Sequence, residues 1–234
     1  MTLSTLTPLG AHIWRMDGPE VVFAGAHMHT RMTLVQLSQG GLWVHSPIAL
    51  SEAVIAAVEA LDAPVTAIIA PNKYHHLYVA DWQRRYPQAH IFAEPKVQQK
   101  IPELAGAQTL TNTTPQLYRE DVDQVLMAGN PQFQEFVFFH KLSRTLILTD
   151  LFINLKITKA TWLARQFLRF EGVVAPDGGI PRLYRWLTLD KATAKDAAQK
   201  IIDWAPERVT FCHGEDFPQD AHNLLQRELH WLLK

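Results

Sequence analysis

Three apolar runs of strand length in this chain are each followed by side chains that can bind a metal. The runs, with the residues that follow them, are 65–70 with His75 and His76, 145–149 with Asp150, and 208–211 with His213. The apolar run at 65–70 is of the kind expected for a strand that is covered on both faces. In layered α/β proteins the ends of such strands position ligand-binding side chains. The sequence therefore predicts an α/β fold in which these residues meet in one pocket.

The order of the expected elements predicts a β-meander followed by alternating strands and helices. Apolar runs separated by Gly-containing turns indicate strands at 12–14, 21–23, 33–37 and 42–45. Further strands are expected at 65–70, 91–93, 124–127, 135–140, 145–149 and 208–211, and helices at 54–61, 80–86, 190–204, 217–234 and over much of 152–186. Ser51 and Asp190 are expected to cap two of these helices. No repeat or shift in composition marks a linker, so we expect a single domain over residues 1–234.

Composition and charge restrict the classes of partner that the chain can have. The formal net charge is −1 and no basic cluster is present, so we expect neither a nucleic acid nor a membrane surface as partner. The single cysteine, Cys212, excludes an internal disulfide and is expected to be a small buried group. Residues 1–7 lack the pattern of a signal peptide, and no apolar run approaches the roughly 20 residues that span a bilayer. These features predict a cytoplasmic protein with a small-molecule ligand or substrate, and they leave the oligomeric state open.

Each candidate site residue also has a purely structural interpretation, which the sequence leaves open. An adjacent pair such as His75 and His76 can supply a metal ligand and its neighbour, or can hydrogen-bond to the backbone instead. Asp150 can bind a cation or cap a helix that begins near Leu151. His213 precedes a glycine, which permits either a surface turn or a close approach of the backbone to a ligand.

Three further histidines are weaker candidates. His27 and His29 form an HxH pair whose rings would share one face of a strand. The pair falls in a stretch that resembles a loop between strands, and no third ligand is nearby, which disfavours a metal site there. His45 ends a strand just before Ser46 and Pro47, and it could line the same pocket as the main candidates.

The order of elements and three short motifs together resemble the metallo-β-lactamase superfamily. That family has a four-layer αββα sandwich with one or two metal ions at the strand ends between its sheets. Its H-x-H-x-D-H motif is similar to Pro-Asn-Lys-Tyr-His-His at 71–76, its T-G-D segment to Leu-Thr-Asp at 148–150, and its closing G-H-G segment to Cys-His-Gly at 212–214. The resemblance covers most of the chain and implies the four-layer α/β fold. The pattern is most similar to a branch of the superfamily that is a domain of unknown function.

Departures from the family pattern imply that the first metal site is lost. Pro71 and Lys73 stand at the positions of the first two histidine ligands, and neither suits a divalent cation. Lys73 would also bring a positive charge to the place that a cation normally occupies. The third ligand of that site should fall near Asn130, whose amide oxygen coordinates only weakly.

The second metal site of the family is better matched. His75 stands where an aspartate is usual, whereas His76, Asp150 and His213 match the pattern. The resemblance therefore implies a ligand set of three histidines and one aspartate, which suits zinc, iron or manganese. We expect one divalent metal here, or none if the site has degenerated further.

Two hypotheses about function follow from this resemblance. The first is a mononuclear metal-dependent hydrolase that uses metal-activated water, with Lys73 or Asn130 stabilising the developing oxyanion. The second is a non-catalytic protein that binds a small molecule or keeps a remnant site, in which Lys73 replaces the cation and forms an ion pair with Asp150. The sequence leaves both hypotheses open.

Overall fold

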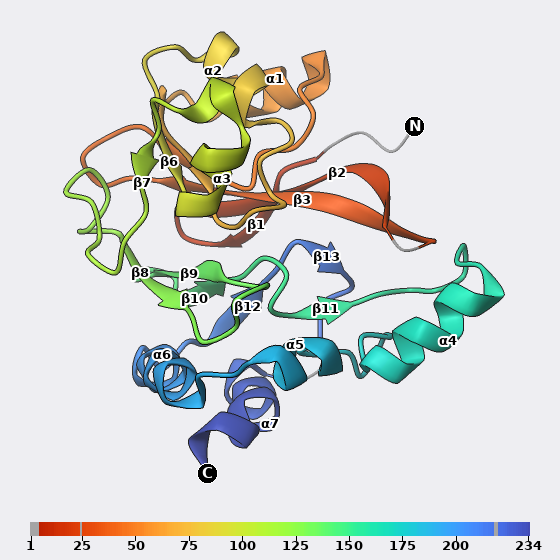
Figure 1. Cartoon of the computed structure of the whole chain (residues 1–234). Helices are drawn as coiled ribbons and strands as arrows, with labels where there is room; N and C mark the ends of the chain where they lie inside the picture. The colour runs from red at the N-terminus through yellow and green to blue at the C-terminus, as the bar shows by residue number, and fades with distance from the viewer. Residues whose placement is uncertain (1–4, 24, 218–219) are drawn as a thin grey trace.

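The computed structural model describes residues 5–23, 25–217 and 220–234 of the chain. Two β-sheets lie face to face in it, and helices cover the outer face of each sheet (Figure 1). The helices on one side are α1 (Glu52–Glu59), α2 (Val79–Arg85) and α3 (Pro95–Lys100), and those on the other are α5 (Arg182–Leu187), α6 (Lys191–Asp203) and α7 (Ala221–Leu233). This order of layers confirms the αββα sandwich that the sequence predicts.

The first sheet contains, among the described residues, seven strands that follow one another in chain order. They are β1 (Thr7–Gly10), β2 (Ile13–Phe23), β3 (Ala26–Gln36), β4 (Leu42–His45), β5 (Val65–Ala70), β6 (His90–Ala93) and β7 (Gln108–Thr109). The strands β2 and β3 form a long antiparallel ribbon, and from β4 onward the neighbouring strands run parallel. The strand β5 is apolar at every position but Thr66, because α2 packs on one of its faces and the second sheet on the other.

The second sheet aligns the chain segments that later form the site. Its strand order is β12 (Arg208–Thr210), β10 (Thr145–Ile147), β9 (Glu135–His140) and β8 (Val122–Met127). The strands β10 and β12 are parallel, with Ile147 beside Thr210, so the segments that follow them leave the sheet at the same edge. A short parallel pair continues these segments, formed by β11 (Ile153–Asn154) and β13 (His213–Gly214).

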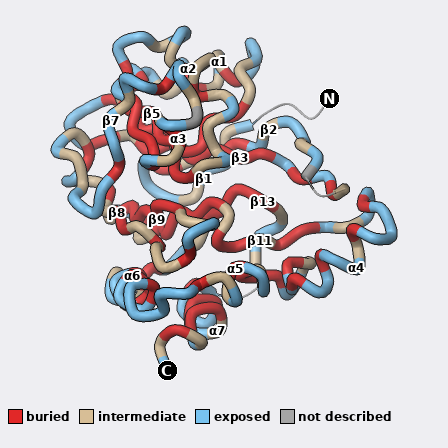
Figure 2. The backbone as a smooth tube through the Cα atoms, viewed as in Figure 1, coloured by how far each residue is buried: buried red, intermediate tan, exposed pale blue. Residues whose placement is uncertain are grey.

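Apolar side chains fill the spaces between the layers, and Figure 2 shows the buried backbone concentrated in the sheets. One cluster joins the first sheet to α1–α3, with Trp82 as its largest side chain, and another joins the second sheet to α6 and α7. Trp43 and Phe138 lie between the two sheets, with ring centroids 5.1 Å apart. A smaller cluster, which includes Met28 and Leu168, holds α4 (Trp162–Glu171) against one end of the β2–β3 ribbon.

Helix caps confirm two of the sequence-based expectations. The Ser51 side chain accepts the backbone N–H of Val54 at 3.3 Å and caps α1. The Asp190 side chain accepts the N–H of Thr193 at 3.1 Å and caps α6. Cys212 is a buried free thiol, as expected. None of the helices in the described ranges has the length and apolar composition needed to cross a bilayer.

The structure corrects three expectations about secondary structure. Residues 12–14 and 21–23 do not form two strands, because a bulge between Asp17 and Glu20 lets one long strand continue through the Gly-Pro sequence. The stretch that carries His27 and His29 is strand β3 and not a loop, since it pairs with β2. The last helix begins at Ala221 and not at 217, and residues 218–219 of its expected range lie outside the described residues.

No helix begins near Leu151, so Asp150 is not a helix cap. Residues 149–152 form bends that lead into β11, and α4 is the next helix in the described chain. The backbone N–H groups of residues 149–151 are bound by the side chain of Glu135, as detailed below. Much of 152–186 is accordingly strand and turn rather than helix.

Candidate metal centre

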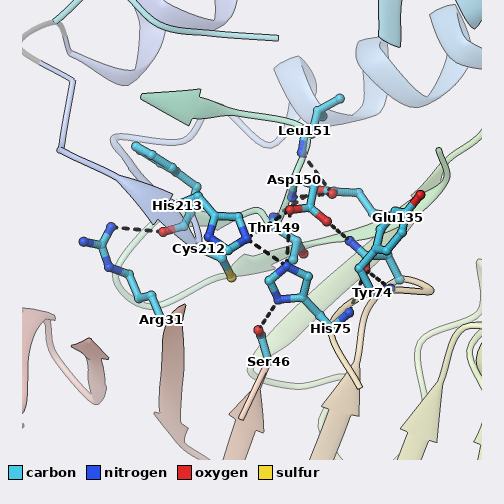
Figure 3. Close-up of polar contacts among 12 residues, drawn as sticks. Arg31, Ser46, Tyr74, His75, Glu135, Thr149, Asp150, Leu151, Cys212 and His213 are labelled. Carbon is cyan, nitrogen blue, oxygen red and sulfur yellow. Dashed lines mark hydrogen bonds and ion pairs between the residues drawn. The ribbon is translucent and has the colours of Figure 1, made fainter. Parts of the chain in front are cut away.

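Three ligand side chains from distant parts of the chain meet at the edge shared by the two sheets (Figure 3). His75 follows β5, Asp150 follows β10, and His213 begins β13. The Nε2 atoms of the two histidines are 3.1 Å apart, and each lies 3.2 Å from Oδ1 of Asp150. Ligands held tetrahedrally at 2.0–2.1 Å from zinc lie roughly 3.3 Å from one another. The three atoms therefore have the spacing of one coordination shell.

The outer nitrogen of each imidazole is held by a partner. Nδ1–H of His213 donates to the carbonyl oxygen of His29 at 2.9 Å, which leaves the Nε2 lone pair pointing at the centre. Nδ1 of His75 lies 2.5 Å from Oγ of Ser46. A hydrogen-bond partner on the nitrogen that does not face the metal orients a metal-binding histidine and sets its tautomer. The donor set thus suits a divalent cation: two imidazole nitrogens and one carboxylate oxygen, aimed at a common point.

Asn72 connects the loop of His75 to Asp150. Its side-chain oxygen accepts the backbone N–H groups of Tyr74 and His75, at 2.9 and 3.0 Å, and shapes the turn after β5. Its side-chain nitrogen donates to Oδ2 of Asp150 at 2.7 Å. The remaining carboxylate oxygen, Oδ1, is the one that faces the histidines. Asn72 therefore sets both the position of His75 and the orientation of Asp150.

A buried carboxylate, Glu135 at the start of β9, supports the segment that carries Asp150. Its two oxygens accept the backbone N–H groups of Thr149, Asp150 and Leu151 at 3.0, 2.7 and 3.0 Å. Burial and the nearby charge of Asp150 together raise the pKa of Glu135 to about 8, although these N–H donors lower it. Three donors on one carboxyl group hold the 149–151 backbone in a non-helical bend.

The protonation of Asp150 is set by the two histidines. Burial alone would raise its pKa, but the charge of His75 and the polar contacts of both imidazoles with the carboxylate outweigh that and hold the pKa of Asp150 well below its usual value. The carboxylate is accordingly ionised at neutral pH, the form in which it can bind a cation.

Backbone contacts fix the segment of His213. Arg31 is almost fully buried and donates to the carbonyl oxygens of Phe211 and Gly214, at 3.0 and 3.1 Å. Gly214 has φ +107°, and a Cβ there would lie 2.0 Å from the carbonyl oxygen of Asn154. Only glycine allows this approach of β13 to β11.

The other sequence-predicted site residues lie outside this group of three. His76 lines the adjoining cavity, but among the described residues the cluster of ligand atoms comprises only His75, Asp150 and His213. Lys73 also lines the cavity, with Nζ 4.9 Å from the ring centroid of Tyr74. The ion pairs within the described ranges do not include one between Lys73 and Asp150.

Asn130 does not face the cavity, which corrects the expectation that it could stabilise an oxyanion. It is fully buried, its side-chain nitrogen donates to the carbonyl oxygen of Tyr184 at 3.0 Å, and its oxygen accepts the N–H groups of Gln132 and Phe133. Both polar atoms of the amide thus form hydrogen bonds that stabilise a turn.

The three weaker histidine candidates have structural partners. His27 and His29 are exposed on β3, at 3.2 and 3.6 Å from the carboxylate of Glu20. His45 is buried against Trp43, with Nε2 3.5 Å from Oγ1 of Thr149, and does not line the cavity. Burial, with the nearby charge of His75, lowers the pKa of His45 to about 3, so this ring is neutral.

The centre lies at one end of a cavity of about 600 Å³. The cavity runs between the β2–β3 ribbon and the segments of α4 and α5, and its lining includes Lys73, His76 and Tyr184 in addition to the three ligand residues. A volume of this size is within the roughly 300–1,000 Å³ of typical small-molecule sites.

Sequence reasoning missed the residues that position the ligands: Ser46, Asn72 and Glu135. Asn72 follows a strand-ending proline, and Glu135 is a carboxylate beside the apolar run 136–139. A polar residue beside an apolar strand is expected to be buried, and a buried polar group needs hydrogen-bond partners. Nothing in the sequence near Ser46 identifies the histidine, 29 residues further on, that it contacts.

Comparisons with known proteins agree with this fold. The family model described as "Domain of unknown function (DUF4336)" matches residues 11–168. No curated protein matches the chain in sequence. Among solved structures, the metallo-β-lactamase from Pontibacter korlensis is 14% identical, with a TM-score of 0.62 and 97% of each chain covered. The metallo-β-lactamase from Hirschia baltica is 15% identical, with a TM-score of 0.61 and coverage of 97% of this chain and 96% of that one.

A third similar structure is the metallo-β-lactamase FIM-1 from Pseudomonas aeruginosa in its mono-zinc form. It is 14% identical, with a TM-score of 0.60 and coverage of 95% of this chain and 91% of that one. Identities this low show the fold alone, whereas the family model covers more than half of the chain. The chain has the metallo-β-lactamase fold and belongs to the family described as "Domain of unknown function (DUF4336)".

Proposed function

We propose that this protein is a hydrolase that uses a single divalent metal ion, held by His75, Asp150 and His213. The observation that carries this proposal is the meeting of three ligand atoms, all within 4.8 Å of one another, at the end of a cavity. Two imidazoles and a carboxylate with an open side are typical of catalytic rather than structural zinc sites. Because FIM-1 is a mono-zinc form on the same fold, zinc is the cation we propose first.

A cation bound here would act as a Lewis acid and supply a hydroxide nucleophile at neutral pH. The chain's own residues prepare the site for that chemistry. Ser46 and the His29 carbonyl orient the two imidazoles, and Asn72 turns one oxygen of Asp150 toward them. Lys73, on the cavity wall, would place its positive charge near the oxyanion that develops on the substrate.

We propose one cation rather than two because the residues at the ligand positions of the family's first metal site, Pro71, Lys73 and Asn130, do not serve as ligands in this chain. The carbonyl oxygen of Pro71 accepts the N–H of Phe136 at 2.9 Å and joins the two sheets. Lys73 is a cation itself, and the Asn130 amide is used in a turn. A second divalent ion would therefore lack ligands at these positions.

Metal content after purification without chelator or added metal tests this proposal. We expect one metal ion per chain in the unaltered protein and loss of metal in His213→Ala. The matched control is His222→Ala, an exposed histidine on α7, which should keep its metal. Circular dichroism must show that both variants are folded. A substoichiometric metal content that is the same in the unaltered protein and in His213→Ala would refute the proposal.

A further inference from the structure

The wall of the cavity away from the metal centre is apolar. Met28 of β3, Leu155 after β11, Val173, and Phe167 and Leu168 of α4 line it, and Leu183 of α5 completes it. Glu171 also borders this side, but one of its oxygens accepts the backbone N–H of Leu183 at 3.0 Å. The ligand residues and Lys73 lie instead in the segments that follow β5, β10 and β12. The cavity thus joins a polar centre to an apolar wall.

Large apolar side chains also remain exposed at the rim. Val22, Leu77, Phe167 and Leu183 all line the cavity, and each is exposed to solvent. Apolar groups that are exposed to water around a concave site favour the binding of an apolar ligand, because the ligand removes them from water. An occupant that fills only the polar end would leave this surface in water.

We propose that the cavity binds an amphiphilic acyl compound, with its hydrocarbon chain against α4 and α5 and its oxygen-bearing head at the metal centre. The chain would cover Phe167, Leu168 and Leu183. The position of the head rests on the proposed hydrolase function, since a cation attracts an acyl or carboxylate oxygen. The apolar part of the proposal stands on the cavity wall alone.

Calorimetric titration with hexanoate, octanoate and decanoate, each below its micelle concentration, tests the apolar part. Complete burial of one methylene tightens binding about fourfold. Decanoate is therefore expected to bind on the order of 100-fold more tightly than hexanoate, if all four extra methylenes are buried. Equal affinities across the series would overturn the proposal.

Two phenylalanines of α4 provide a matched pair of variants. Phe167 is 44% exposed and lines the cavity, whereas Phe170 is 48% exposed and does not. We expect Phe167→Ala to weaken decanoate binding on the order of tenfold, and Phe170→Ala to leave it unchanged. If both variants weaken binding equally, or neither does, the ligand does not occupy this cavity and the proposal fails.

Repeating the titrations after EDTA treatment separates this inference from the proposed function. Removal of the metal should weaken all three carboxylates while the dependence on chain length persists. A protein that never contained metal but shows the chain-length dependence refutes the hydrolase proposal and supports the apolar site. A metal-loaded protein with equal affinities along the series does the reverse.

Discussion

Gly214→Ala should both destabilise the protein and disturb the metal centre. The new Cβ would lie 2.0 Å from the carbonyl oxygen of Asn154, closer than such contacts can be, so β13 must move away from β11. That movement stretches the bond from the Glu215 N–H to the Asn154 oxygen, 2.8 Å, and the bond from the Asn154 side chain to the Glu215 carbonyl, 2.9 Å. His213, the adjacent residue, moves with the strand.

The size of the effect follows from these losses. Two hydrogen bonds contribute about 0.5–1.5 kcal/mol each, and a left-handed backbone conformation costs alanine about 1–2 kcal/mol. Together they lower the free energy of unfolding by roughly 2–5 kcal/mol. For a chain of this length, each kcal/mol shifts Tm by about 2–4 °C. Gly40→Ala is the control, because Gly40 has φ +91° but nothing within 4 Å of the new Cβ.

Urea unfolding and zinc titration of both variants provide the assay. Gly40→Ala should show only the backbone cost, about 1 kcal/mol once the lower entropy of the unfolded chain is included, with unaltered zinc affinity. Gly214→Ala should lose more stability and also bind zinc more weakly. If the two variants lose equal stability and both bind zinc normally, the close approach at β13 does not position His213.

Three further predictions address the ligands and buried histidines. Asn72→Ala frees the carboxylate of Asp150 and should weaken zinc binding about 10–100-fold in a competition titration, with unaltered affinity as the contrary result. EDTA should lower Tm of the unaltered protein but not of His213→Ala, because only a bound ion adds to the stability of the folded state. Burial lowers the pKa of His140 to about 4 from an ordinary 6.5. Between these two pH values the imidazole is protonated in the unfolded chain but neutral in the folded one, so acid favours unfolding. The free energy of unfolding, measured with urea, should therefore fall between about pH 6.5 and 4, by at most about 3 kcal/mol from His140. It should fall less steeply in His140→Gln. An equal pH dependence of the two proteins would show that His140 is not the cause.

The elements that could be predicted from the sequence are those with a local signal. The strand β5 is an apolar run broken only by Thr66, and α1 and α6 each begin at a side-chain cap, Ser51 or Asp190. The strands β11 and β13 escaped prediction because each is two residues long and is held by partners far away in the sequence. Their sequences have no period to detect, since two residues cannot show one.

The position of the site was predictable for a topological reason, but its exact ligands were not. Parallel strands that end at one edge bring the following residues together, so Asp150 and His213 could be paired before their contact was known. The choice between His75 and His76 depends on the turn after β5, which Asn72 shapes through two backbone N–H groups. Asn72 in turn binds Asp150, 78 residues away. Which of two adjacent histidines faces the centre is therefore decided by a contact that no local pattern reports.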